Sequence, residues 1–418
     1  MKKIIFILIY LFPFVLYSQD ILRVRETIDS LTAPRMHGRG AENNGETIAA
    51  KFIRNKFSVL GLNTFQGSFY QKFTYDINTF PNKVALQIGK KELCPGKDFI
   101  LNGASGSGKG TAPLFFLDSL QLANKTLYNR LLKKAFAGKA IVIPEAIEKQ
   151  ILNNEALIVK LKEAAAILVL KHKLTEGLAS FQTPFVYFEV LDQAFPPNAK
   201  KIHFNVDAQV IENFEANNVI GYIPGSVNKD SIIVISAHYD HLGQMGANVY
   251  FPGANDNASG ISMLLEFAHY FTENPPPYSI AFMAFGAEEA GLVGSHYYVE
   301  NPLFPLEKIK FLINLDLVGT GDEGIMVVNG AVLPRQFELL SQINAIQKDV
   351  PAVKKRGEAA NSDHYFFYKN GIPSFFIYTL GGIKAYHDIY DRPETLPLTK
   401  YKGVFQLIVR FIHKLEAQ

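Results

Sequence analysis

The half of the chain after residue 219 alternates between short apolar runs and longer amphipathic segments. The apolar runs have the length of strands that are buried on both faces, and they lie at 231–237, 278–285, 308–316, 324–330 and 372–379. Helical periodicity marks 259–273 and the segments around 334–348, 362–369 and 399–416. This alternation predicts an α/β fold with a mixed, mostly parallel central sheet covered by helices on both faces. Such sheets bind their ligands beyond the carboxyl ends of the strands.

The residues before this half divide into two segments. Residues 21–62 have mostly helical periodicity, which stops near Gly61. Residues 65–210 contain strand-like runs with helical stretches between some of them, few histidines and no cluster of acids beside them. We therefore expect a smaller inserted α/β domain over 65–210, joined to the rest through the polar stretch 211–218. Residues 20–64 and 211–418 would then form the domain that carries the chemistry.

The N-terminus is a segment of a different kind. Two lysines precede an apolar run over residues 4–17, which Pro13 interrupts and the small Ser18 follows. The run is shorter than the ~20 residues that a spanning helix needs. The pattern predicts a secretory signal peptide over residues 1–19 and a periplasmic or extracellular location, with an uncleaved anchor as the alternative. No other apolar run is long enough to span a bilayer, so no stable membrane insertion is expected after signal removal.

Charge and cysteine content exclude further classes of protein. The chain has 42 Lys and Arg against 39 Asp and Glu, and its basic residues are scattered, so we expect no nucleic-acid partner. Cys94 is the only cysteine, which rules out an internal disulfide. A lone cysteine without an associated histidine motif is expected to be a small buried side chain and not a nucleophile. Stability must therefore come from core packing or from bound metal.

Acidic and imidazole side chains follow the predicted strands five times, either at the strand exit or in the loop behind it. They are His238 with Asp240, Asp256, the pair Glu288 and Glu289, Asp316, and His387. Such side chains at five places on the ligand-binding edge of one sheet indicate a metal centre. Imidazole and carboxylate without thiolate suit Zn²⁺, Co²⁺ or Mn²⁺, whereas Mg²⁺ and Ca²⁺ prefer sites made only of oxygen.

The number of donors favours two metal ions. One catalytic zinc needs three protein ligands and a water, whereas two ions ~3.5–4 Å apart would use the whole set. The adjacent acids Glu288 and Glu289 also require a positive partner, because neighbouring carboxylates at the end of a buried strand repel each other. One of the two would bind metal and the other would transfer a proton, and the spacing does not fix which does which.

Six motifs resemble, in order and spacing, those of the M28 zinc peptidases, a family that includes bacterial leucine-type aminopeptidases. They are SAHYDHLG, PGANDNASG, AFGAEEAGLVGS, INLDLVG, SDHYFFYKNGIP and YHDIYD. They cover residues 219–398, and the segment 31–62 is similar to the one that opens many members. Residues 65–210 resemble the protease-associated domain of some members only loosely, through GKAIVIP and AAAILVL. The resemblance implies a fold of the zinc exopeptidase type.

The resemblance also implies a set of metal ligands, residue by residue. His238 and Asp316 would bind one zinc ion, and Glu289 and His387 would bind the other. Asp256 would bridge the two ions. The implied cofactor is therefore two Zn²⁺ per chain.

Other positions receive roles from the same resemblance. Glu288 would be the general base, and Tyr386 would help to stabilise the oxyanion, as in some members. Asp240 would fix the imidazole ring of His238, and Asp363 would lie close to the site without binding metal. Four other histidines of this half are expected to be structural: His241, His269, His296 and His364.

These roles imply an exported dinuclear zinc aminopeptidase, which would hydrolyse N-terminal residues from peptides with metal-activated water. One alternative on the same scaffold is a single-zinc glutaminyl cyclase, and another is a carboxypeptidase. The stretch NDNASG, together with His238 and Asp316, favours two metals over the cyclase. A binding protein that has lost its chemistry is a further alternative, but such relatives typically lack ligands that are intact here.

Overall fold

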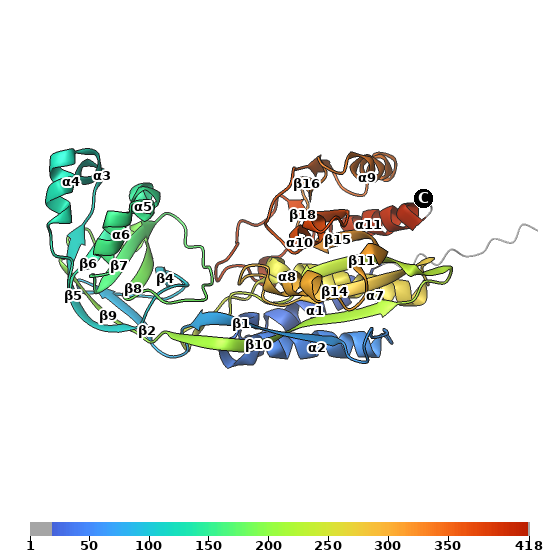
Figure 1. Cartoon of the computed structure of the whole chain (residues 1–418), viewed down its shortest axis with the longest axis horizontal. Coiled ribbons are helices and arrows are strands. Elements are labelled where there is room, and N and C mark those ends of the chain that lie inside the picture. Colours follow the sequence, from blue (N-terminus) through green and yellow to red (C-terminus); the bar gives the residue numbers. More distant parts are fainter. Residues whose placement is uncertain (1–18, 417–418) are drawn as a thin grey trace, which may run out of the picture.

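The structure, a computed structural model, describes residues 19–416 and has two lobes side by side (Figure 1). The predicted signal peptide, residues 1–19, lies outside the described residues except for its last position. Among the helices of residues 19–416, none is long and apolar enough to cross a membrane.

The larger lobe is built on an eight-stranded mixed sheet. Its strands have the order β1-β10-β14-β11-β15-β18-β16-β17. Their bounds are β1 Tyr70–Thr79, β10 Gln209–Ile223, β14 Tyr278–Phe285, β11 Asn228–His238, β15 Ile309–Leu315, β18 Ser374–Leu380, β16 Gly324–Val328 and β17 Val353–Lys355. The four central strands, from β14 to β18, are parallel to one another. The sheet confirms the predicted fold class, and it brings the carboxyl ends of these four strands to one edge.

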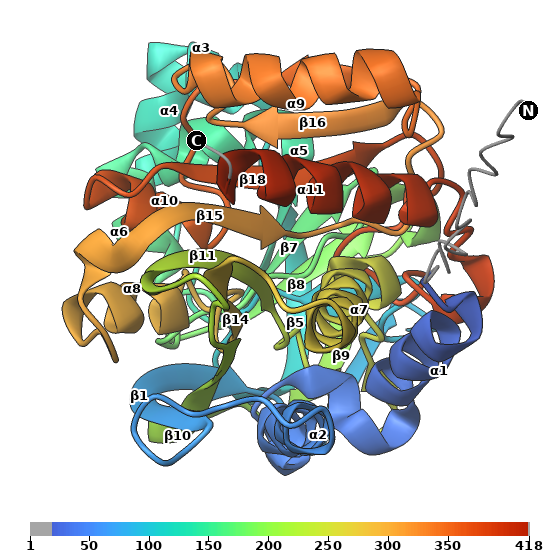
Figure 2. The same cartoon turned by 90° about the vertical axis from the view of Figure 1, so that its right-hand side faces the viewer.

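Helices cover both faces of this sheet because alternate side chains of the central strands point to opposite faces. Ile233 and Ile235 of β11 pack on one face, and Ile232 and Val234 pack on the other. The first face carries α1 (Ile21–Thr32), α2 (Gly45–Val59), α7 (Gly260–Glu273), α9 (Pro334–Gln347) and α11 (Tyr401–Glu416), several of which Figure 2 shows in front of the strands. The second face carries α8 (Val293–Glu300) and α10 (His364–Lys369).

The smaller lobe has its own eight-stranded sheet, with the order β3-β2-β9-β5-β6-β7-β8-β4. Its strands are β2 Val84–Ile88, β3 Lys91–Leu93, β4 Phe99–Leu101, β5 Gly108–Phe116, β6 Ala140–Pro144, β7 Ala166–Lys171, β8 Val186–Leu191 and β9 Lys201–Val206. Its helices are α3 Ser119–Ala123, α4 Lys125–Leu132, α5 Glu145–Leu152 and α6 Glu155–Leu161. Cys94 lies in this lobe and is exposed, so our expectation that it is buried was wrong.

Both boundaries of the smaller lobe differ from those predicted for the inserted domain over 65–210. β1, which begins after residue 65, belongs to the larger sheet, and the expected connection 211–218 lies within β10. The first part of β10 pairs only with β1, and the two strands reach toward the smaller lobe as an antiparallel ribbon. Several of its side chains are polar and exposed, which explains why the sequence resembled a linker.

Candidate metal centre

Three neighbouring strands deliver donors to the same edge of the larger sheet. β11 ends at His238, and the parallel register places this residue beside Phe285, the last residue of β14. Glu288 and Glu289 follow in the next turn, and Asp316 comes directly after β15. The end of a buried apolar strand thus determines the position of each of these donors.

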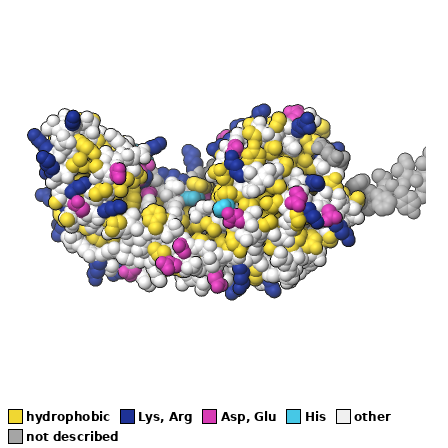
Figure 3. All heavy atoms as spheres, viewed as in Figure 1, with side chains coloured by type: hydrophobic (Ala, Val, Ile, Leu, Met, Phe, Trp, Pro, Cys, Tyr) yellow, Lys and Arg dark blue, Asp and Glu magenta, His cyan; other side chains and the backbone are white. Residues whose placement is uncertain are grey.

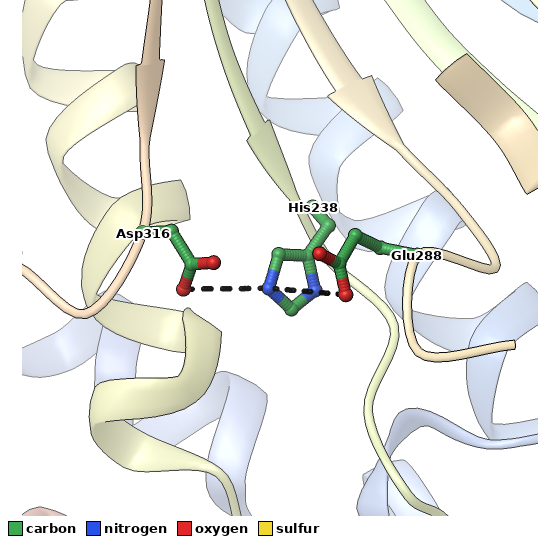
Figure 4. Close-up of side chains that lie close together, drawn as sticks. All are labelled: His238, Glu288 and Asp316. Carbon is green, nitrogen blue, oxygen red and sulfur yellow. Dashed lines mark ion pairs between the residues drawn. The ribbon is translucent and has the colours of Figure 1, made fainter. Parts of the chain in front are cut away.

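The first cluster of donors surrounds His238. Its Nε2 atom lies 3.4 Å from Oδ1 of Asp256 and 3.5 Å from Oδ1 of Asp316. Oε2 of Glu288 is further away, at 4.0 Å. Figure 4 shows the imidazole ring between the carboxylates of Asp316 and Glu288. Asp256 itself comes from the irregular turn that precedes α7.

The second cluster surrounds His387, which lies in the loop after β18. Its Nε2 atom is 3.2 Å from Oδ2 of Asp256 and 3.1 Å from Oε2 of Glu289. The two carboxylate oxygens of Asp256 therefore face different clusters, Oδ1 toward His238 and Oδ2 toward His387. All five residues that the sequence singled out as ligands meet at this edge.

His241 also belongs to this region, although we expected it to be structural. Its Nδ1 atom is 2.7 Å from Oε1 of Glu289, and its Nε2 atom is buried without a hydrogen-bond partner. With Asp256 and Glu289 it forms a group whose potential ligand atoms lie within 4.8 Å of one another. The only sequence signal was its place three residues after His238 in the same strand-exit loop.

The electrostatics of the two clusters demand positive charge. Burial alone would raise the pKa of a carboxyl group and lower that of an imidazole. Against burial, hydrogen bonds from His238 and His387 hold the pKa of Asp256 well below its usual range. Burial also opposes the charge on His387, yet Glu289 and Asp256 raise the pKa of its imidazole to about 11. The carboxylates of both clusters thus favour positive charge beside them.

Arg39 holds the backbone around the clusters and was missed by the sequence analysis. Its guanidinium is fully buried and donates to five carbonyl groups. The acceptors are the carbonyl oxygens of Leu31, Tyr239, Pro252, Gly253 and Asp256, at 2.6–3.1 Å. Although burial lowers its pKa to about 10, the side chain stays charged at neutral pH. The segments after His238 and before Asp256 are therefore joined through one side chain.

Two buried carboxylates bind the backbone of the donor loops. Asp240 accepts hydrogen bonds from the amides of Glu288 and Glu289, at 3.0 and 3.1 Å, and lies 3.6 Å from Nδ1 of His238. Asp391, which the sequence analysis did not single out, accepts from the amides of residues 255 and 256 at 2.9–3.0 Å. The carboxylates thus orient the loops as well as the ring.

Asp363 lies beside the first cluster, but its neighbour Ser362 makes the direct contact. Oγ of Ser362 donates to Oδ2 of Asp316 at 3.1 Å and accepts from the side-chain Nδ2 of Asn314 at 2.8 Å. The carboxyl group of Asp363 is fully buried, which raises its pKa to about 7. The nearby charge of His238 acts in the opposite direction.

The clusters open into a cavity of about 220 Å³. The ring of Tyr386 stacks on that of His387 with centroids 4.0 Å apart, and it forms part of the cavity wall. Burial and the neighbouring carboxylates raise the pKa of the Tyr386 hydroxyl, so it remains protonated. The other walls include Arg356 and Asn361. The cavity is large enough for a small ligand group and presents both acidic and hydroxyl side chains to it.

Several residues next to the donors have left-handed backbone conformations. Ala287 precedes Glu288 at φ 52°, Leu317 follows Asp316 at φ 56°, and His387 has φ 51°. Such conformations are unfavourable for residues with a β-carbon, and they often occur where a functional side chain must be directed. The surrounding contacts must therefore hold these loops in place.

The donor set fits divalent metal ions. Among the described residues, no lysine or arginine forms an ion pair with Asp256, Glu288, Glu289 or Asp316, and their ion-pair partners are histidines. Oδ1 of Asp316 is buried and accepts no hydrogen bond. Imidazole and carboxylate donors that converge in this way, without a lysine or arginine paired to them, suit zinc.

Fold and site together define a class: α/β proteins with a metal centre at the carboxyl edge of a mixed sheet. Residues 218–412 match the sequence model of Peptidase family M28. The match begins within β10 and ends within α11, so it includes all the donors described above.

Curated relatives and solved structures agree with this assignment. Aminopeptidase YwaD of Bacillus subtilis is 34% identical over 166 residues, which are 39% of this chain and 35% of that protein. An aminopeptidase of Pseudomonas aeruginosa is 31% identical over 187 residues, 41% of this chain and 32% of that protein. This chain therefore spans about a third of the length of these curated relatives. A zinc aminopeptidase from Bacillus subtilis has the same fold, with a TM-score of 0.72 at 21% identity over 95% of both chains.

Proposed function

We propose that this chain is a zinc metallopeptidase that removes residues from the N-termini of peptides. The observation that carries the proposal is the pair of donor clusters that share Asp256, with a further carboxylate, Glu288, at their edge. The family of residues 218–412 and the aminopeptidase names of two relatives support the same activity.

The proposed ligands form two sites. His238 and Asp316 would hold one zinc ion, His387 and Glu289 would hold the other, and Asp256 would contribute one oxygen to each. Zinc bound there would supply positive charge that polarises the scissile carbonyl and lowers the pKa of water. His241 would donate from Nδ1 to Glu289 and so fix the orientation of that carboxylate.

Glu288 is the proposed general base. Its carboxylate borders the cavity and lies further from His238 than Asp256 and Asp316 do, which leaves it available for proton transfer. It would take a proton from the attacking water and deliver it to the leaving amine. Asp240 would hold the amide of Glu288 in place during both steps.

The other parts of the proposal concern export. The charged and apolar pattern of residues 1–19 supports a signal peptide and a periplasmic or extracellular enzyme. N-terminal sequencing of the chain recovered from the medium or periplasm would test this, with a start near residue 20 as the expected result.

Metal content and substrate choice test the activity directly. We expect about two zinc ions per purified chain and hydrolysis of aminoacyl anilides, because two clusters of donors share one bridging carboxylate. The measurement is elemental analysis paired with a panel of aminoacyl anilides, a glutaminyl peptide and N-terminally blocked peptides with free C-termini. One zinc with cyclisation of the glutaminyl peptide would replace the proposal with a cyclase. Cleavage only at free C-termini would indicate a carboxypeptidase.

Tyr386 should contribute to the rate without binding metal. We expect Tyr386→Phe to lower kcat by about 10²-fold, the effect typical of removing one donor to a developing oxyanion, while zinc content and KM change little. Tyr390→Phe is a matched control, because Tyr390 is also a partly exposed tyrosine of the same loop but does not line the cavity. Equal kcat values for the two variants would remove Tyr386 from the mechanism.

A further inference from the structure

The two lobes meet at the loop that carries His387. In the smaller lobe, residues 172–185 connect β7 to β8, and in the larger lobe residues 381–391 follow β18. These loops contact each other although more than 200 positions separate them in the sequence. Figure 3 shows the surface hollowed between the lobes, where these connections run in Figure 1.

The backbone of Glu176 pairs with His387 in both directions. Nδ1 of the imidazole lies 2.8 Å from the carbonyl oxygen of Glu176, and the amide of Glu176 donates to the carbonyl oxygen of His387 at 2.9 Å. An imidazole that donates from Nδ1 to a carbonyl group presents Nε2 as the ligand atom. Nε2 of His387 is the atom that faces Asp256 and Glu289. The smaller lobe thus fixes both the orientation and the tautomer of this ring.

Lys173 holds the same loop on both sides of His387. Its Nζ atom donates to the carbonyl oxygens of Lys384 and Tyr386, at 3.2 Å each, and lies 3.5 Å from Oδ2 of Asp388. One ammonium group therefore joins three positions of the loop to the smaller lobe.

The larger lobe gives residues 384–388 little support of its own. Apart from the contacts of the His387 ring with its carboxylates, the hydrogen bonds that reach these described residues from outside their loop come from Lys173 and Glu176. His387 also has a left-handed backbone conformation at φ 51°, which its surroundings must maintain.

We propose that the smaller lobe is a positioning element for the metal centre, in which Lys173 and the backbone of Glu176 hold His387 in its ligating orientation. The inference rests on the proposed function for its metal, but it assigns a task to the inserted lobe that the donor set alone does not. Lys173 is a positioning residue, because it contacts the loop and not the substrate.

A matched pair of lysine variants tests this positioning role of Lys173, which is called the clamp below. Lys173→Met removes the ammonium contacts to the loop, whereas Lys171→Met, two positions earlier, removes ion pairs with Glu145 and Glu148 inside the smaller lobe. We expect Lys173→Met to release one of its two zinc ions at a chelator concentration about 10–100-fold lower than wild type does, the usual effect of removing a group that orients a ligand. Lys171→Met should release zinc as wild type does, and Lys173→Arg should restore most of the retention.

Zinc retention and activity are measured separately, so two failures can be told apart. If the chelator curves of Lys173→Met and Lys171→Met coincide, whether both shift or neither does, the clamp is wrong. If wild type binds two zinc ions but cleaves no aminoacyl substrate, the proposed function fails while the shifted curve of Lys173→Met still supports the clamp. Thermal unfolding of the metal-free proteins checks that the lysine changes act on metal retention and not on the fold.

Discussion

Replacing Glu288 with glutamine should lower kcat by about 10²–10⁴-fold while the chain keeps both zinc ions. The amide has the size of the carboxylate but cannot accept a proton, and general-base catalysis contributes a factor of this order. In the proposed arrangement Glu288 binds no metal, and the amide of residue 288 still donates to Asp240. The measurement is kcat for an aminoacyl anilide beside the zinc content of the same sample.

The adjacent acid provides the control. Glu289→Gln makes the same chemical change one residue away, but it weakens a side chain that contacts both His387 and His241. We expect this variant to lose about one zinc ion per chain as well as activity, because carbonyl oxygens are poorer zinc ligands than carboxylates. If Glu288→Gln loses zinc and Glu289→Gln keeps it, the two roles are exchanged. If both keep zinc and full activity, neither acid performs the proposed chemistry.

The sequence predicted the central sheet and its donors because both depend on local patterns. Short apolar runs such as 232–235 are typical of buried strands, and their ends are marked by charged residues that are costly to bury in the core. His238 and Asp316 occupy such ends, and parallel pairing brings them to one edge without further information. The fold class follows from the same pattern.

The residues that the sequence did not reveal act through distant contacts. His241 resembles an ordinary core histidine until Glu289 is placed 2.7 Å from it. Asp391 binds the amides of a turn about 135 positions earlier, and Lys173 contacts a loop 211 positions later. The polar half of β10 resembled a linker because its partner, β1, lies far away in the chain. In each case the role of the residue depends on a contact with a distant part of the chain, and the local sequence pattern does not predict such a contact.

Arg39→Met should lower the free energy of unfolding of the chain by about 3–5 kcal/mol. Arg39 is fully buried in a glycine-rich loop, and methionine would fill part of its volume but leave five carbonyl groups without a donor. A buried acceptor that is left without a donor costs about 1–3 kcal/mol, so the loss of several donors should lower the free energy of unfolding by about 3–5 kcal/mol. Because Arg39 bonds the carbonyl groups of Tyr239 and Asp256, zinc retention should fall as well.

Arg25→Met is the matched control for this prediction. Arg25 also donates to two carbonyl groups, those of Pro393 and Pro397, but its side chain is only partly buried, so water can replace it at a cost of about 1 kcal/mol or less. Urea unfolding of the metal-free proteins gives both free energies of unfolding. If Arg39→Met does not fold, Arg39→Lys keeps the charge with fewer donors and should fall between wild type and Arg39→Met. If the free energies of unfolding of the Arg39 variants lie within about 1 kcal/mol of that of Arg25→Met, the guanidinium does not hold the metal-bearing loops together.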